Sequence, residues 1–196
     1  MPQGHETSGA RGKTVVNTQN GNETSTATTR YEVAYRSPHQ SDAVPIHTLV
    51  KASPPLDVNS TYAYALIAAH FADTSVVAEH EGRLAGFVSA YLKPAGPAVL
   101  FVWQVAVDAT ARGGGIGTGM LRWLLNRPAC RHVRHLETTI TPSNESSWRL
   151  FRGLSDRLHA PYDVSPHFFS TELGCAHEPE HLFRIGPFPP RAGDGP

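Results

Sequence analysis

AVLFVWQVAVDATARGGGIG, residues 98–117, joins the most apolar run of the chain to its densest cluster of glycines. The β-branched and aromatic side chains of 98–107, between Pro97 and Asp108, predict a buried central strand rather than a helix. Downstream, apolar residues recur at helical spacing as far as about Pro128. This stripe consists of Ile116, Met120, Leu121, Leu124 and Leu125. The glycines therefore lie where a strand gives way to a helix.

A glycine-rich turn before a helix is a natural anion site. The first helical turn has N–H groups without intrahelical partners, and the helix dipole places partial positive charge there. Glycines let the backbone approach phosphate oxygens and adopt positive φ. Four of the five residues 113–117 are glycine. We therefore expect this turn to bind a phosphate or pyrophosphate group.

Three phosphate-binding sequence patterns can be compared with the residues of this turn. A P-loop needs GxxxxGK[ST], but no lysine follows Lys93. A dinucleotide fingerprint needs GxGxxG, and the frames that start at Gly113 and Gly115 end on Thr118 and Met120 instead of glycine. The remaining pattern, R-x-x-G-x-G, is met by Arg112, Gly115 and Gly117.

That pattern, between a strand and a helix, resembles the pyrophosphate loop of the GNAT acyltransferase superfamily. Residues 144–151 (NESSWRLF) are similar to the second cofactor segment of that family, N-x-x-[AS]-x-x-x-[YF]. The resemblance implies an α/β (α+β) fold with a mixed central sheet flanked by helices, acetyl-CoA as cosubstrate, and no metal. The cofactor-binding residues it implies are Val105, Val107, Arg112, Gly113, Gly114, Gly115, Ile116, Gly117, Asn144 and Phe151. Many members have a tyrosine at the last position as the acid for the departing thiolate, and phenylalanine cannot fill that role.

Segments 54–64, 101–107, 139–151 and 177–185 are similar, in the same order, to the diaminobutyrate acetyltransferases of the ectoine pathway. The similarity covers roughly residues 31–187. That family transfers acetyl from acetyl-CoA to the γ-amino group of L-2,4-diaminobutyrate, and the resemblance also implies a homodimer. The substrate-pocket residues it implies are Asp57, Tyr62, Trp103, His177 and Glu180.

The chemistry of such a substrate suits these side chains. Diaminobutyrate carries two ammonium groups and one carboxylate, and an alkyl ammonium with a pKa of about 10 must lose a proton before it attacks a thioester. Asp57 or Glu180 could pair with an ammonium group, and Glu180 is the favoured base, with Asp57 as the other candidate. Alternatively, Asp57 orders a turn and Trp103 belongs to the core.

Two other functions are compatible with these residues. One is GNAT acetyl transfer to another small diamine or amino acid, and the other is a CoA-binding sensor without catalysis. A third reading comes from residues 177–181, HEPEH, which match the zinc-protease pattern HExxH. That motif needs a helix, and Pro179 is unfavourable inside one. We therefore expect no metal there.

The order of expected strands and helices along the chain predicts a single domain of mixed α/β structure. Residues 1–30 are predicted to form a disordered tail, 31–187 the GNAT domain and 188–196 a frayed end. The expected strands are 31–37, 75–80, 84–92, 98–107, 134–140, 167–173 and 181–185. The expected helices are 42–51, 61–72, 116–128 and 143–153, with Tyr62, Leu66 and Ala69 on one face of the second.

Composition narrows the class of protein. The net charge is zero and the pI is near 7.2, so no electrostatic feature favours nucleic acid or membrane binding. Residues 112–157 nevertheless hold eight arginines against three acidic residues, which suits a small polyanion. The two cysteines, 130 and 175, form no disulfide framework, and the first thirty residues lack a signal-peptide core. We expect a cytoplasmic protein.

Overall fold

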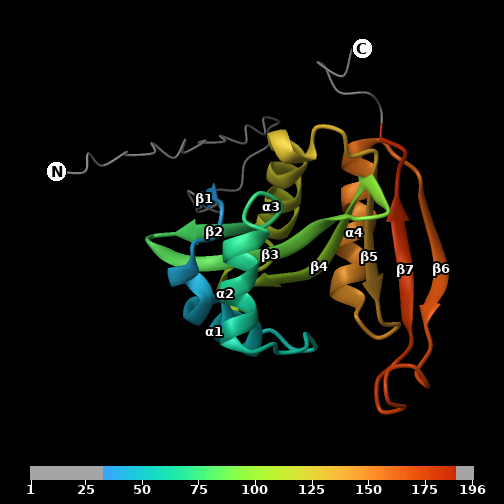
Figure 1. Cartoon of the computed structure of the whole chain (residues 1–196), viewed down its shortest axis with the longest axis horizontal. Helices are drawn as coiled ribbons and strands as arrows, with labels where there is room; N and C mark the ends of the chain where they lie inside the picture. Colours follow the sequence, from blue (N-terminus) through green and yellow to red (C-terminus); the bar gives the residue numbers. More distant parts are fainter. Residues whose placement is uncertain (1–32, 189–196) are drawn as a thin grey trace, which may run out of the picture.

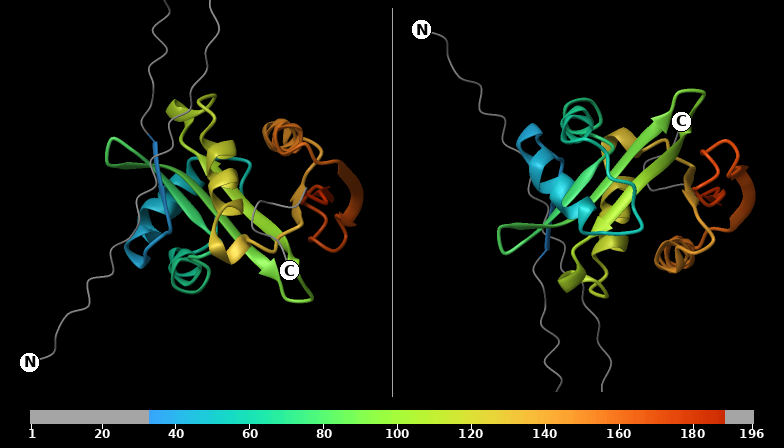
Figure 2. Two further views of the ribbon diagram at one scale, coloured as in Figure 1. Left: turned by 90° about the horizontal axis from the view of Figure 1, so that it is seen from above. Right: turned by 90° about the horizontal axis from the view of Figure 1, so that it is seen from below.

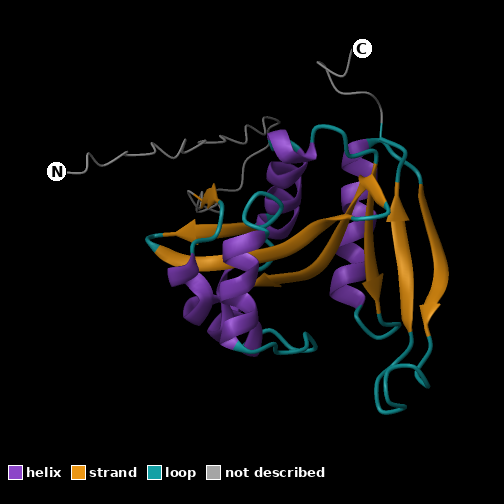
Figure 3. Ribbon diagram, viewed as in Figure 1, coloured by secondary structure: helices purple, strands orange, loops and turns teal. Residues whose placement is uncertain are grey.

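The computed structural model describes residues 33–188, and they form one seven-stranded sheet flanked by helices (Figures 1 and 3). The strand order is β1-β2-β3-β4-β5-β7-β6, which places β4 at the centre. The strands are β1 (Val33–Arg36), β2 (Val76–His80), β3 (Arg83–Lys93), β4 (Gly96–Val107), β5 (His135–Ile140), β6 (Tyr162–Phe168) and β7 (Glu180–Ile185). The predicted tail, 1–30, lies outside the described residues, as does nearly all of the predicted frayed end.

Strand pairing follows from how the chain connects. β2 and β3 form a hairpin through Glu81 and Gly82, both at positive φ. β3 and β4 pair antiparallel, and so do β5 and β7, and β6 and β7. Within the described residues, β4 and β5 are the one parallel pair, because α3 (Ile116–Leu125) makes the crossover between them. This crossover confirms a mixed sheet.

Helices cover both faces of the sheet (Figure 2). Their packing gives two hydrophobic cores, one on each face. On one face, α1 (Ala43–Lys51) and α2 (Thr61–His70) pack on Phe87 of β3. On the other face, α3 and α4 (Glu145–Leu158) pack on β3, β4, β5 and β7. Three short 3-10 helices complete the described chain: Gln40–Asp42, Ala109–Ala111 and Pro128–Cys130.

The structure refines three local predictions. Tyr62, Leu66 and Ala69 do share one face of α2, but it is the exposed face, and the buried side carries Tyr64, Ile67 and Ala68. This helix is apolar almost all round, so periodicity alone could not select its buried face. The sixth strand is Tyr162–Phe168 rather than 167–173, because it is an edge strand with little burial on either side. α4 also continues five residues beyond its predicted end.

Candidate active site

The sheet opens at its centre. β4 pairs with β5 only at Val99–Phe101, so no strand of the described chain lies beside the rest of β4 on that side. The change coincides with a bulge, because Ala90 pairs with Val102 while Ser89 pairs with Gln104, leaving Trp103 as an extra residue. Beyond the bulge, backbone N–H and C=O groups on the open side therefore pair with no described strand and can bind a ligand, except the Val107 carbonyl, which accepts a hydrogen bond from Arg112.

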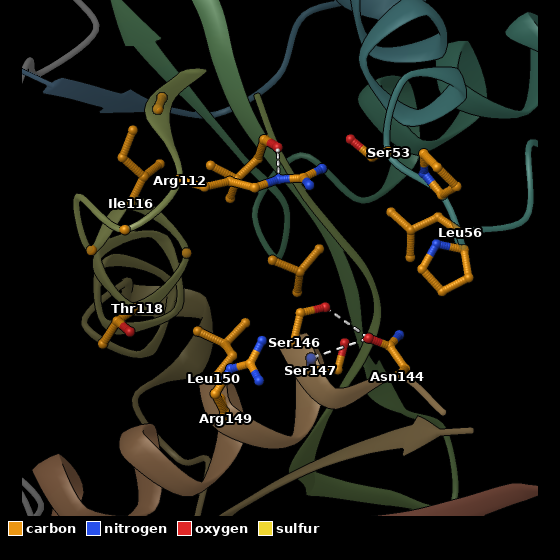
Figure 4. Close-up of a pocket in the computed structure, with 18 residues that line it drawn as sticks. Ser53, Leu56, Arg112, Ile116, Thr118, Asn144, Ser146, Ser147, Arg149 and Leu150 are labelled. Carbon is orange, nitrogen blue, oxygen red and sulfur yellow. Dashed lines mark hydrogen bonds between the residues drawn. The ribbon is translucent and has the colours of Figure 1, made fainter. Parts of the chain in front are cut away.

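A cavity of about 540 Å³ lies beside this open edge (Figure 4). Its walls come from the loop after α1, the end of β4, the glycine turn and the start of α4. Of the predicted cofactor-binding residues, the cavity is lined by Val105, Val107, Arg112, Gly113, Gly115, Ile116, Gly117 and Asn144. The structure thus brings together the two segments that the sequence places about thirty residues apart.

The glycine turn has the geometry of an anion site. Gly113 and Gly115 both have φ near +80°, and Gly115 is the residue from which α3 begins. The first helical bond beyond the turn runs from Gly119 N to Gly115 O. The N–H groups before it have no intrahelical acceptor and carry the positive end of the helix dipole. Arg112 reinforces the turn, because its Nε donates to the Val107 carbonyl at 3.1 Å.

A second helix also begins at the cavity. Asn144 caps α4 by accepting a hydrogen bond from Ser147 N at 3.2 Å and another from Ser146 Oγ at 2.8 Å (Figure 4). Arg149, on the next turn, lines the same cavity. Two helix N-termini and two arginines therefore face one space, which suits a ligand with several phosphate groups.

Three of the predicted substrate residues form a cluster next to the cavity. His177 Nε2 lies 3.5 Å from Asp57 Oδ2 and 4.0 Å from Glu180 Oε1. Asp57 follows Leu56, which lines the cavity. Glu178, beside His177, accepts hydrogen bonds from the N–H and hydroxyl of Ser143, immediately before Asn144. The loop before β7 is thus bound to the start of α4.

The cluster holds titratable groups with shifted pKa values. Burial raises the pKa of the Glu180 carboxyl above its ordinary value, although Thr139 and His177 partly oppose this. The hydrogen bond between His177 Nδ1 and the Glu178 carbonyl, 2.7 Å long, raises the pKa of His177, and Asp57 and Glu180 raise it further. A carboxylate with a raised pKa is a better proton acceptor than an ordinary one.

Four predicted site residues belong neither to the cavity lining nor to the cluster of Asp57, His177 and Glu180. Tyr62 on α2 is 71% exposed. Trp103 is 49% exposed on the bulge of β4, so it is not the core residue of the alternative interpretation. Phe151 is buried and packs against Phe183 with ring centroids 6.2 Å apart. Gly114 belongs to the glycine turn without lining the cavity, whereas the unpredicted Ser53, Pro54 and Leu56 do line it.

The HExxH segment is not helical. His177 lies in a loop and His181 in β7, paired with Ile140 of β5, so the two imidazoles do not share a helix face. Within residues 33–188, no group of three or more histidine, cysteine, aspartate or glutamate side chains is arranged to hold a metal ion. Over the same residues, the helices are too short or too polar to cross a membrane.

Comparison with known proteins agrees with this geometry. The model of the acetyltransferase (GNAT) family matches residues 44–155. An L-2,4-diaminobutyric acid acetyltransferase from Chromohalobacter salexigens is 52% identical over 157 residues, which cover 80% of this chain and 82% of that protein. The chain belongs to the diaminobutyrate acetyltransferase family of GNAT enzymes.

Other diaminobutyrate acetyltransferases extend the match. The enzyme from Virgibacillus pantothenticus is 41% identical, and the aligned region covers 76% of this chain and 95% of that protein. The solved diaminobutyrate acetyltransferase of Paenibacillus lautus, in complex with L-2,4-diaminobutyric acid and coenzyme A, is 42% identical with a TM-score of 0.79. It covers 83% of this chain and 99% of that structure. Membership in this family makes the chain an acetyl-CoA-dependent acyltransferase.

Proposed function

We propose that this protein transfers the acetyl group of acetyl-CoA to the γ-amino group of L-2,4-diaminobutyrate. The observation that carries the proposal is the juxtaposition of a cavity built for phosphates with the Asp57, His177 and Glu180 cluster. The identity of 41–53% to diaminobutyrate acetyltransferases gives further support. Two acidic side chains beside a histidine whose pKa is raised suit a substrate that bears both ammonium and carboxylate groups.

The cofactor half of the site is proposed to bind CoA through backbone groups. The N–H groups of the glycine turn would hold the pyrophosphate, and Arg112 and Arg149 would add positive charge. The open edge of β4 at Val105 and Val107 would pair with the amides of the pantetheine arm. The thioester would then lie near the point where β4 leaves β5, and backbone donors there would polarise its carbonyl.

The acceptor half is proposed to perform direct transfer in a ternary complex. Glu180, with its raised pKa, accepts a proton from the γ-ammonium, directly or through water, and the neutral amine attacks the thioester carbonyl. Asp57 is the other candidate base, Asp57 or Glu180 pairs with an ammonium group, and Trp103 and Tyr62 complete the pocket wall. The CoA thiolate is a stable leaving group that solvent can protonate, so the lack of a tyrosine hydroxyl at Phe151 is tolerated.

Mixing the enzyme with acetyl-CoA and a panel of amines tests this assignment. We expect free-thiol release to be fastest with diaminobutyrate and slower with ornithine, lysine and diaminopropionate. Faster release with another amine would reassign the acceptor. Tight CoA binding without thiol release would instead favour a non-catalytic sensor. A homodimer is also part of the proposal, and sedimentation velocity measures it.

A further inference from the structure

One buried polar side chain stands out in the central strand. Gln104 is 4% exposed, in a run that is otherwise apolar from residue 98 to 107. Both ends of its carboxamide are bonded. Nε2 donates to the main-chain carbonyl of Asp57 at 2.7 Å, and Oε1 accepts from the hydroxyl of Tyr64 at 3.3 Å. A buried amide with both groups satisfied fixes its partners strongly, because breaking either bond leaves a desolvated group.

The bulge of β4 directs this side chain. Gln104 pairs with Ser89 of β3, because Trp103 is the extra residue of the bulge and has no paired residue on β3. Ala106, two residues further, packs in the core under α1 and α2, so Gln104 lies on that same face. The bulge lies just beyond the last residue of β4 that pairs with β5. It therefore also turns Gln104 toward the loop between α1 and α2.

The loop is held at two points by this network. Tyr64, fully buried on α2, accepts a hydrogen bond from the Asn59 N–H at 3.3 Å while its hydroxyl donates to Gln104. The carbonyl of Asp57 and the N–H of Asn59 are thus both tied to the core. The Asp57 side chain itself is 83% exposed, and its contact in the structure is with His177. Its placement depends mainly on the main chain beneath it.

We propose that Gln104 is a positioning residue for the acceptor: with Tyr64 it fixes the main chain at residues 57–59, so that the Asp57 carboxylate faces His177 and Glu180. This inference rests on the proposed function, in which that cluster binds the amine. Gln104 acts through Asp57 and touches neither substrate. Its loss should be felt more by the acceptor than by acetyl-CoA, because the tethered main chain begins after Leu56 of the cavity wall, and Val105 and Val107 line the cavity from the opposite face of β4.

Steady-state kinetics of Gln104→Met and Tyr64→Phe test the proposal. Methionine keeps the volume of glutamine without its hydrogen bonds, and Tyr64→Phe removes one oxygen only. We expect the KM for diaminobutyrate to rise about tenfold in Gln104→Met, while the KM for acetyl-CoA changes less than about twofold. Equal rises in the KM for diaminobutyrate and the KM for acetyl-CoA would overturn the proposal. Ser89→Ala, at the paired position where the buried hydroxyl has no partner within the described residues, is the matched control and should change neither constant.

A double-mutant cycle with Asp57→Asn separates positioning from general structural damage. If Gln104 acts through Asp57, Gln104→Met should raise the KM less than about twofold in the Asp57→Asn background. An undiminished tenfold effect there would contradict the proposal. The cycle can be read with whichever amine the parent enzyme acetylates, so a wrong acceptor assignment fails in the amine panel and not here.

Amide hydrogen exchange provides a readout that needs no substrate. In Tyr64→Phe the Asn59 N–H loses its acceptor, so we expect it to exchange faster, together with neighbouring amides of residues 57–59. Unchanged exchange at these positions would show that the network does not fix the loop. This measurement also serves if Gln104→Met fails to fold.

Discussion

The imidazole Nε2 of His177 lies 3.5 Å from the Asp57 carboxylate, although Asp57 precedes the second helix and His177 comes near the end of the described chain. The contact joins the loop before α2 to the loop before β7 on the acceptor side of the site. It also makes the charge of His177 depend on a loop from the first third of the sequence, which gives a direct spectroscopic test.

Replacing Asp57 by asparagine should lower the pKa of His177. The Glu178 carbonyl remains the main cause of the raised value, and the Asp57 carboxylate adds to it. Histidine Cε1 proton chemical shifts, followed by NMR against pH, report the change. Asp73→Asn, which removes a carboxylate bound to Arg127, is the control and should leave the titration of His177 unaltered. An unshifted His177 in Asp57→Asn would show that the two side chains do not interact in solution.

Glu180→Gln tests the assignment of the base. In the parent, kcat/KM should fall on the acid side as Glu180 becomes protonated, and the raised pKa moves that fall toward neutral pH. The variant should lose this acid limb, the fall of kcat/KM at acid pH, and its kcat/KM should be lower by about 100-fold or more. Glu178→Gln removes the same charge two positions away and should keep the limb. Full kcat of Glu180→Gln across the pH range would remove Glu180 as base.

The same substitution should alter the pH dependence of stability. The folded-state pKa of Glu180 is raised, so its contribution to stability is complete below the unfolded-state pKa and is lost as pH rises through the folded-state value. Glu180→Gln stays neutral, so we expect it to gain stability relative to the parent between acid and neutral pH. Denaturant unfolding at several pH values measures the difference, and a relative loss of stability would contradict it.

Much of the cofactor half was predictable from local sequence. The apolar strand 98–107, the glycine turn and the helix stripe are short-range features, and they lie as expected. The helix predicted from residue 143 begins at Glu145, and Asn144 caps it, because an asparagine side chain at a helix start can satisfy free N–H groups. Cavity-lining Ser53 and Leu56 were missed, since nothing in their local pattern indicates a loop that reaches the cavity.

The acceptor half depended on the family resemblance. No spacing rule predicts that Asp57 meets His177, because their approach requires the bulge and the long connection between β6 and β7. Gln104 was overlooked, although a lone amide inside an apolar strand is a visible sign of a buried polar contact. Tyr62 was placed by the same resemblance, and its exposed position on α2 leaves its role a proposal.

A matched pair of glycine substitutions tests the turn. Gly115 and Gly82 have φ of +77° and +72°, and an added Cβ would meet no atom within 4 Å at either site. Each alanine variant should therefore lose about 1 kcal/mol of stability through backbone strain alone. Only Gly115→Ala should also raise the KM for acetyl-CoA, by roughly tenfold, because it redirects the N–H groups at the start of α3. Equal KM values in the two variants would argue against the turn as the pyrophosphate site.

Restoring a tyrosine at position 151 should not restore a catalytic acid. Phe151 is 2% exposed and packed on Phe183, so a hydroxyl there would be buried in apolar surroundings. We expect Phe151→Tyr to lower the free energy of unfolding by about 1–3 kcal/mol and to leave kcat no higher than in the parent. A faster enzyme would show that position 151 reaches the thiolate.

The most direct test of the central claim is the structure of the product. Acetyl-CoA and L-2,4-diaminobutyrate are incubated with the enzyme, and the product is identified by mass spectrometry and two-dimensional NMR alongside free-thiol release. The account predicts the Nγ-acetyl compound, with one thiol released for each acetyl group transferred. Acetylation at the α-amine, or no acetylated product while acetyl-CoA is bound, would contradict it.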